Sequence, residues 1–178
     1  MILSDKAIKQ AIHFGDISIE PFNEKNLGSN SYDLHLSEHV AMYNGELLDA
    51  AMNNELTRST ISKNGELLRP NELYLMSTIE RTGSKKYVPM IEGKSSVARL
   101  GIQVHLTAGF GDVGFDGHFT LEVIVTKPVI VYAGMPIAQI YFQEVSGEVE
   151  TPYNTKKSAK YNNQSILPQE SKMYRNKF

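Results

Sequence analysis

Two spacings of apolar residues are visible along the chain. The first is helical: an apolar stripe follows Ser4, a preferred N-cap residue, and ends before Gly15, a common C-terminal stop. The members of this stripe lie one, three or four positions apart: Ala7, Ile8, Ala11 and Ile12. We therefore predict an N-terminal helix that packs against the rest of the molecule through this stripe.

From residue 17 onward, apolar and polar residues alternate instead, as they do in a half-buried strand. Alternating or β-prone runs cover residues 17–20, 32–37, 102–107, 119–125, 129–132 and 137–142. Turn-forming pairs such as Asn44-Gly45 and Asn64-Gly65 separate them, and no later segment has a long helical pattern. The sequence thus predicts an all-β sandwich or barrel with short helices rather than a βαβ fold.

Residues 151–178 differ in composition from residues 1–150. They are rich in Lys, Asn, Gln, Ser and Tyr and poor in aliphatic residues, so they cannot bury enough apolar surface to fold alone. We predict a β domain over residues 1–150 and a C-terminal tail over residues 151–178. The tail is expected either to be flexible or to be ordered by lying over another surface.

Composition narrows the class of protein. The 178 residues are 41% hydrophobic and 21% charged, as in a globular domain, and 18 basic against 20 acidic residues give a net charge of −2. A chain this close to neutral is a poor candidate for binding long DNA or RNA, although a nucleotide needs only a few local cations. The early charged residues and the lack of a run of about 18 apolar residues predict a cytoplasmic protein without a signal peptide or membrane span.

The segment 92–101 combines glycine, hydroxyl groups and cations. Gly93 lets the backbone approach a ligand, Lys94 and Arg99 carry positive charge, and Ser95 and Ser96 offer hydroxyls. If Ser95 opens a helical turn, the N–H groups of that turn form an anion site. The pattern is not a P-loop, because the first glycine of that motif is missing. The alternative is a Gly/Ser loop followed by a solvated cation.

Two acids further along the chain are candidates for polar chemistry. Asp112 lies in a glycine-rich connection, where it would contact a sugar hydroxyl, orient a water or cap the turn. Glu122 interrupts an apolar strand and points away from its Phe/Leu/Val face. It is therefore either partly desolvated, as a proton shuttle requires, or an exposed strand carboxylate. The five histidines show no metal-ligand spacing, and we interpret each as a surface or hydrogen-bonded residue.

Taken in order, these segments resemble the dCTP deaminase family, which belongs to the trimeric dUTPase-like superfamily. The resemblance covers nearly the whole chain and rests on both the order and the spacing of its motifs. The motifs are residues 1–5 (MILSD), 30–36 (NSYDLHL), 93–101 (GKSSVARLG), 104–109 (VHLTAG), 111–115 (GDVGF), 120–122 (TLE), 132–137 (YAGMPI) and 159–164 (AKYNNQ).

The resemblance implies a distorted jelly-roll or β-clip fold, a homotrimer with active sites between subunits, and a tail that closes over the nucleotide. The implied reaction is hydrolytic deamination of dCTP to dUTP and ammonia, which supplies dUMP for thymidylate synthesis. Mg²⁺ is expected to arrive on the triphosphate rather than in a protein cage. A further expected ligand is dTTP, as an inhibitor.

The resemblance also implies roles for individual residues. Glu122 matches the catalytic glutamate, and Ser95 and Arg99 match residues that orient the base and the water. The other implied substrate-binding residues are Lys94 and Ser96 on the phosphates, Val97 and Ala98 in the same segment, Asp112 near the deoxyribose, Thr120 and Leu121 beside the glutamate, and Tyr153, Lys160 and Gln164 in the tail.

The product and the metal requirement depend on two further features. The chain has no cysteine and so cannot build the His/Cys/Cys zinc site of classical cytidine deaminases, which makes the implied deamination zinc-independent. Many single-function members carry a basic residue where this chain has Phe110. Bifunctional relatives, which go on to cleave dUTP to dUMP and pyrophosphate, often carry an aromatic residue there. We favour release of dUTP; the alternatives are the bifunctional reaction, a dUTP pyrophosphatase alone, and a non-catalytic nucleotide-binding module.

Overall fold

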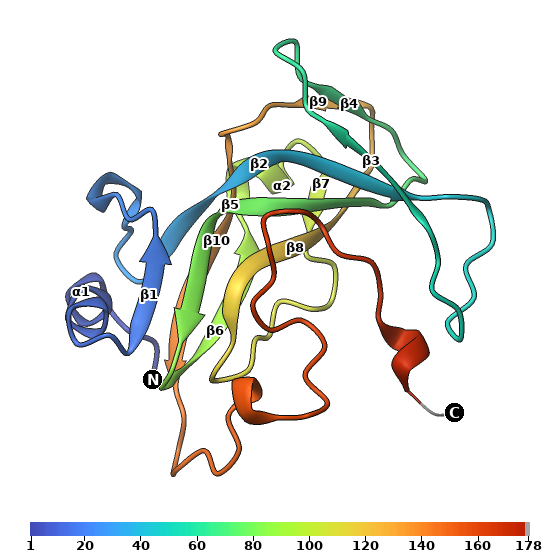
Figure 1. Ribbon diagram of the computed structural model, residues 1–178. Helices are drawn as coiled ribbons and strands as arrows, with labels where there is room; N and C mark the ends of the chain where they lie inside the picture. The colour runs from blue at the N-terminus through green and yellow to red at the C-terminus, as the bar shows by residue number, and fades with distance from the viewer. Residues whose placement is uncertain (177–178) are drawn as a thin grey trace.

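The computed structural model describes residues 1–176 and consists mainly of β strands (Figure 1). Its helices are α1 (Asp5–His13) and the one-turn α2 (Ser95–Ala98), with 3₁₀ turns at Glu24–Asn26, Tyr153–Thr155 and Met173–Arg175. Its strands are β1 (Ile17–Glu20), β2 (Tyr32–Tyr43), β3 (Leu56–Thr60), β4 (Glu66–Leu68), β5 (Tyr74–Ser84), β6 (Tyr87–Gly93), β7 (Ile102–Val104), β8 (Asp116–Val125), β9 (Val129–Val131) and β10 (Pro136–Glu144). The predicted all-β class with short helices is confirmed.

One sheet of eight strands forms the body of the molecule. Its order is β6-β10-β2-β5-β8-β7, with β1 paired to β5 and β3 to β2, while β4 and β9 form a separate pair. The loop after β7 returns to β6, where Ile91 N donates to Gly109 O and Gly111 N donates to Pro89 O, each at 2.8 Å. The sheet is thereby nearly closed into a barrel. A Cβ at position 109 would lie 2.4 Å from the Ile91 carbonyl oxygen, so this close approach requires glycine.

The N-terminal helix has the predicted boundaries and packing face. Ser4 caps α1 by accepting a hydrogen bond from Ala7 N at 3.3 Å, and Gly15 follows the helix with a φ of 72°. Ile8 and Ala11 are 0% and 2% exposed. In Figure 1 the helix lies beside β1, at one side of the sheet and away from the tail. It therefore stabilises the fold without taking part in the site described below.

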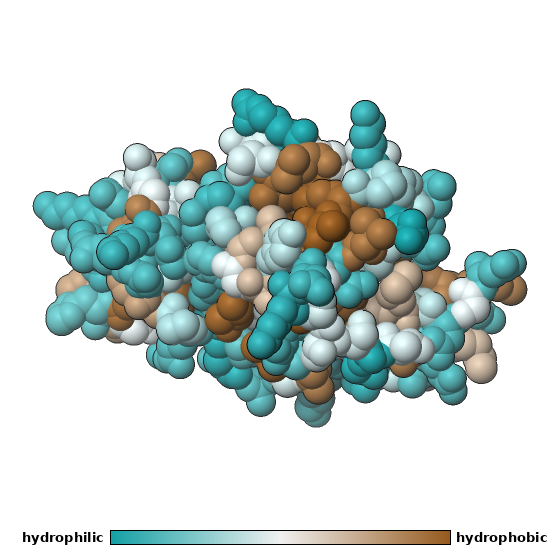
Figure 2. All heavy atoms as spheres, turned by 90° about the horizontal axis from the view of Figure 1, so that it is seen from above, coloured by the Kyte–Doolittle hydropathy of each residue, from teal (hydrophilic) through white to brown (hydrophobic). Residues whose placement is uncertain are grey.

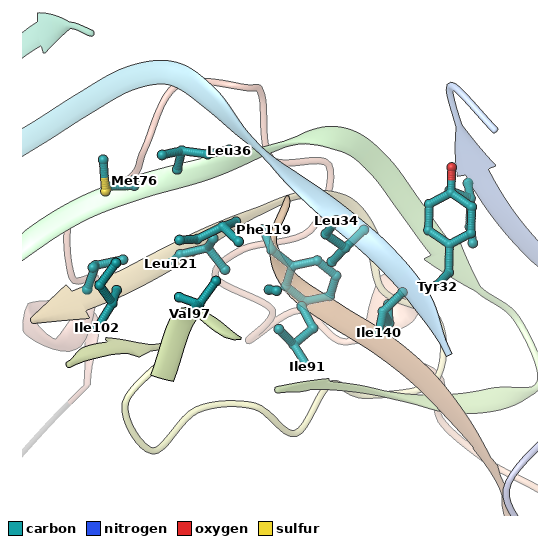
Figure 3. Close-up of a cluster of buried hydrophobic side chains, with 14 of the residues drawn as sticks. Tyr32, Leu34, Leu36, Met76, Ile91, Val97, Ile102, Phe119, Leu121 and Ile140 are labelled. Carbon is teal, nitrogen blue, oxygen red and sulfur yellow. The ribbon is translucent and has the colours of Figure 1, made fainter. Parts of the chain in front are cut away.

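The interior of the sheet is filled by aliphatic and aromatic side chains (Figure 3). Leu34 of β2, Leu121 of β8 and Ile140 of β10 are all fully buried there. Val97 joins this cluster from α2, so the core anchors the one-turn helix to the inner side of β8. Because side chains alternate along a strand, the outer face of β8 carries a different set: His118, Thr120, Glu122 and Ile124.

The alternation of apolar and polar residues does not predict β3, β4, β5 or β6. The largest omission is β5, which lies at the centre of the sheet between β2 and β8 and buries Ser77, Thr78 and Glu80. Partners on the two neighbouring strands, β2 and β8, satisfy these polar groups. The Glu80 carboxylate, for example, accepts from His35 N at 2.8 Å and lies 2.6 Å from His35 Nδ1. Buried polar residues with such partners remove the apolar signal of a central strand.

The strand predicted over residues 102–107 is wrong at its C-terminal end. β7 stops at Val104, because His105 has a φ of 58° and the chain leaves the sheet there. Leu106, predicted to continue the apolar face, is 43% exposed in the following loop. A left-handed residue cannot extend a strand, and a histidine in that conformation gives no warning in the apolar pattern.

The described part of the tail, residues 151–176, folds back over the outer face of the sheet (orange and red in Figure 1). It contains 3₁₀ turns but no strand. Gln169 N donates to Thr120 Oγ1 at 3.1 Å, and Ser171 N donates to Tyr43 Oη at 2.8 Å. The tail thus lies over a surface that orders it; residues 177–178 are outside the described range. Within residues 1–176, no helix has the length and apolar character needed to cross a membrane.

Candidate active site

A cavity of about 640 Å³ opens between the outer face of β8, the loop after β7 and the tail. Thr120 and Glu122 line it from β8, and Asp112 lines it from the loop. Tyr153 and Gln164 line it from the tail. Five of the residues predicted from the sequence are therefore brought together by the fold. The volume is in the range of sites that enclose a small molecule.

Glu122 lines this cavity with 31% of its side chain exposed, and it is paired with His105. His105 Nδ1 lies 2.7 Å from Glu122 Oε2, and the imidazole donates this bond because a carboxylate only accepts. The two residues are cross-strand neighbours one step beyond the β7–β8 register, and His105 N donates to Glu122 O at 2.8 Å. This contact orients one carboxylate oxygen and leaves the other to act on a ligand.

His105 is itself held firmly. Only 8% of the residue is exposed, its backbone is left-handed, and its ring lies edge-on to Phe119 with 6.1 Å between ring centroids. A non-glycine residue in this conformation costs free energy and is found most often where function requires it. The sequence alone predicts this histidine only as a surface or hydrogen-bonded residue. The available signal is its position, three residues after the start of β7, the strand that pairs with β8 and hence with Glu122.

Gln164 reaches the cavity wall from the tail and is 7% exposed. Its side-chain oxygen accepts a hydrogen bond from Thr120 Oγ1 at 3.1 Å, and its backbone oxygen accepts one from His118 N at 3.1 Å. With the amide oxygen held by Thr120, the amide N–H₂ group is the part of Gln164 that remains for a ligand. Thr120 and Gln164 therefore act as one polar unit in the cavity wall.

Asp112 and Tyr153 line the cavity near the start of the tail. Asp112 Oδ2 lies 3.4 Å from Lys156 Nζ, and this ion pair joins the glycine-rich loop to the tail. Tyr153 Oη accepts from Lys160 N at 3.1 Å and from Tyr161 N at 2.9 Å. Tyr153 thus shapes the path of the tail as well as the cavity.

Lys160, the third predicted tail residue, lies beside the main cavity. It lines an adjacent cavity of about 480 Å³, which shares Tyr43 and Tyr161 with the larger one. Its ammonium group donates to Asn176 Oδ1 at 2.7 Å. Burial raises the pKa of the Tyr43 phenol, which keeps this shared wall residue neutral.

The predicted residues of segment 94–99 lie elsewhere. Val97 packs into the core together with Leu121, whose side chain faces inward from β8 and not toward the cavity. Lys94 is ion-paired with Asp33, and Arg99 Nη1 donates to Ser95 O at 3.0 Å. The remaining predicted residues of this segment are exposed to solvent: Ser95, Ser96 and Ala98. In a single chain, then, α2 packs on the inner side of β8, and Glu122 is on the outer side.

Charge separates the two regions as well. The main cavity is lined by three acids, Asp112, Glu122 and Glu170, and by no lysine or arginine from the described part of the chain. Segment 94–99 carries Lys94 and Arg99 and no acid. An anionic ligand in the cavity would need cations from outside it. Across residues 1–176, no three His, Cys, Asp or Glu side chains lie in a group that could hold a metal ion.

Comparisons with known proteins show which family the sequence resembles. A family model described as dCTP deaminase-like matches residues 2–145. A protein of Clostridium acetobutylicum named "dCTP deaminase, dUMP-forming" is 47% identical over 169 residues, which are 94% of this chain and 95% of that protein. A protein of the same name from Leptospira biflexa is also 47% identical, over 94% of each chain.

A crystal structure of 2'-deoxycytidine 5'-triphosphate deaminase from Agrobacterium tumefaciens shares the fold, with a TM-score of 0.63 and 21% identity. The match covers 81% of this chain and 48% of that one, so this chain spans about half of that longer protein. The family model and the relatives of near-equal length show that this chain belongs to the dCTP deaminase-like family.

Proposed function

We propose that the protein hydrolyses dCTP to dUTP and ammonia in the cavity under the tail. The observation that carries the proposal is the His105–Glu122 pair, a carboxylate oriented by a buried 2.7 Å hydrogen bond at the wall of a cavity of about 640 Å³. The names of relatives that match over 94% of the chain support dCTP as the substrate.

In the proposed reaction Glu122 accepts a proton from water while the water oxygen bonds to C4 of cytosine. Glu122 passes this proton to N3 of the ring, then takes the proton of the new C4 hydroxyl and delivers it to the amino group, so that the C4–N bond breaks and ammonia leaves. The oxygen stays on C4 as the carbonyl of uracil, so one water is consumed for each ammonia released. His105 keeps the carboxylate aimed during these transfers. The reaction is proposed to need no zinc, since the chain has no cysteine for the site that zinc deaminases use.

We further propose that each site is completed by a second copy of the chain, in a homotrimer. Within residues 1–176, the cavity lining supplies the carboxylate and no lysine or arginine, whereas Ser95 and Arg99 are exposed on the other side of β8. A neighbouring copy that presents its α2 segment to the cavity supplies the missing charge. Figure 2 shows apolar side chains gathered on the end of the molecule where β4 and β9 lie. Ile130 there is 50% exposed, and such patches favour contact with another chain.

A second candidate product is dUMP. The relatives from Clostridium acetobutylicum and Leptospira biflexa are both named dUMP-forming, which favours the bifunctional reaction over the release of dUTP expected from the sequence. Phe110 lines the cavity mouth and is 65% exposed, and this is the position at which an aromatic residue resembles the bifunctional group. In the second step a water attacks the α-phosphorus of dUTP, and pyrophosphate leaves.

Mg²⁺ is proposed to enter with the nucleotide. The described residues offer no group of three carboxylate or imidazole ligands, so the phosphate oxygens and water would supply most of its coordination. Lys160 and the neighbouring copy's Lys94 would compensate the remaining phosphate charge. A cytoplasmic location and inhibition by dTTP remain predictions from the sequence.

Product analysis tests the proposal. Purified protein is incubated with dCTP and Mg²⁺, and ammonia, dUTP, dUMP and pyrophosphate are quantified, with Glu122→Gln as the matched control. One ammonia per dCTP consumed is expected, and dUMP with equimolar pyrophosphate identifies the bifunctional enzyme. Cleavage of dUTP without ammonia from dCTP would assign a pyrophosphatase alone. Tight dCTP binding without any product would assign a binding module.

A further inference from the structure

The tail reaches the cavity along the part of the β8 edge that β7 leaves unpaired. β7 pairs with the C-terminal half of this strand, from Val123 to Val125, and ends there. Along the N-terminal half, Asn163 N donates to Asp116 O at 2.7 Å and His118 N donates to Gln164 O at 3.1 Å. These two backbone bonds set the tail against β8 at the position from which Gln164 enters the cavity.

The same junction holds an arginine that no sequence motif assigns. Arg81, on β5, lies with Nε 2.7 Å from Asp116 Oδ1 and with Nη2 2.6 Å from Asn163 Oδ1. Its guanidinium therefore bridges the start of β8 and the tail, with an ion pair to Asp116 and a hydrogen bond to Asn163 from one planar group. Such a fork is pre-organised and fixes orientation in a way that a lysine cannot.

The residue that Arg81 holds in the tail is conformationally demanding. Asn163 has a φ of 56°, a left-handed backbone that asparagine tolerates better than most residues, and it directly precedes Gln164. The approach is also close: a Cβ at Gly117 would lie 2.6 Å from Gln164 N. A small change at Asn163 is thus transmitted to Gln164, because the adjacent peptide has little room to adjust.

We propose that Arg81 is a positioning residue, which sets Gln164 in the cavity by holding Asn163 and Asp116. This inference rests on the proposed function, in which Gln164 contacts the nucleotide. Arg81 itself does not line the cavity, so it acts through the tail and not on the substrate. The Arg81–Asp116 ion pair lies at the surface, with Asp116 about half-exposed and Arg81 one-third exposed. Removal of the Arg81 side chain should therefore leave the core intact.

The kinetic test is a double-mutant cycle of Arg81→Ala and Gln164→Ala, with Arg81→Lys as the conservative variant. Arg81→Ala should lower kcat/KM for dCTP by about 5–20-fold, mainly through KM, and Arg81→Lys should recover part of the loss. In the Gln164→Ala background, removal of Arg81 should cost less than about twofold, because its target is gone. Lys9→Ala is the matched control, since it removes another exposed ion pair, with Glu24, far from the cavity.

Limited trypsin digestion gives a readout that does not depend on catalysis. Arg81→Ala should increase the rate of cleavage at the tail lysines several-fold without nucleotide, whereas Lys9→Ala should match the wild type and both should unfold at similar temperatures. Additive losses in the cycle, or unchanged kinetics and digestion in Arg81→Ala, would overturn the inference. A wild-type protein that fails to deaminate dCTP overturns the proposed function instead, and the digestion still decides whether Arg81 anchors the tail.

Discussion

The two regions that carry the predicted site residues are built in opposite ways. The cavity on the outer face of β8 is enclosed by the tail and lined by three carboxylates. The α2 segment is one turn long, and Val97 is its only residue that packs into the core. Its two serines are exposed to solvent, and so is Arg99, which follows the helix. One region is acidic and sheltered, and the other is basic and open.

Under the proposed function, this difference means that neither region is a complete site by itself. A carboxylate that activates water works best in a sheltered place with fixed partners, and His105 and Phe119 provide that for Glu122. A triphosphate needs cations, which the sheltered region does not offer among its described lining residues. The regions are complementary, but β8 separates them within a chain. The comparison therefore predicts that function depends on pairing unlike regions from two copies.

The largest effect is expected from removing the proposed proton-transfer group of the sheltered region. Glu122→Gln keeps the shape of the side chain and its contact to His105 but cannot take a proton from water. Ammonia release from dCTP should fall by about 10³-fold or more, while dCTP binding by calorimetry changes by less than about fivefold. Undiminished turnover would remove Glu122 from the mechanism.

Mixing two inactive variants tests directly whether one site combines the cavity of one copy with the α2 segment of another. Glu122→Gln and Arg99→Ala should each be inactive alone, because each lacks one region. When the two are unfolded, mixed in equal amounts and refolded together, about one quarter of the sites in random trimers should combine two intact regions. Activity should rise to about that fraction of the wild type. A mixture that stays inactive, with mixed oligomers verified by mass spectrometry, would place both residues in the same chain's site.

An intermediate effect is expected at His105, which lines the cavity and orients Glu122 by a hydrogen bond. His105→Leu removes the hydrogen bond and should lower kcat by about 10–100-fold, since a misplaced catalytic group costs rates of this order. His105→Asn keeps a donor near the Nδ1 position and tolerates the left-handed backbone, so it should retain most of the activity. Equal losses in the two variants, measured as kcat and KM from pH 6 to 9, would contradict a positioning role.

The smallest effect is expected from weakening the packing of the α2 segment against the core. Val97→Ala should lower the free energy of unfolding by about 1–3 kcal/mol, because Val97 is 3% exposed and its removal leaves a cavity in the core. Urea unfolding at fixed protein concentration measures this. Since Ser95 and Arg99 are held only by this one-turn helix, kcat/KM should fall by several-fold as well. Lost activity without lost stability would show that Val97 serves the site and not the core.

Local sequence patterns predict the helix and strands best where a segment packs one face on the core and exposes the other. The N-terminal helix and the strands β1, β2, β8, β9 and β10 follow their apolar patterns, since each has one face on the core and one outside it. The alternation does not predict β5, the central strand, because Ser77, Thr78 and Glu80 are buried there with hydrogen-bonding partners on β2 and β8. Those partners are distant in sequence, so no local pattern contains them.

The site is less fully determined by the sequence than the fold. Glu122, Asp112, Thr120, Tyr153 and Gln164 line one cavity, the predicted residues of segment 94–99 do not, and the roles of all of them stay predictions. The residue pattern itself singled out Asp112 and Glu122 as candidates, and the family resemblance added the other three residues and assigned the roles. His105 was missed as a partner of Glu122, because the hydrogen bond between them exists only once β7 pairs with β8.

By itself, the sequence determined which residue types are present, which segments alternate, and how the motifs are ordered along the chain. These properties follow from spacing over a few residues, and so they survive without knowledge of the fold. The tertiary structure alone decided that α2 and Glu122 lie on opposite sides of β8, that His105 orients the carboxylate, and that Arg81 joins the tail to the sheet. Each depends on contacts between segments far apart in sequence, which form because burying apolar surface brings the strands together.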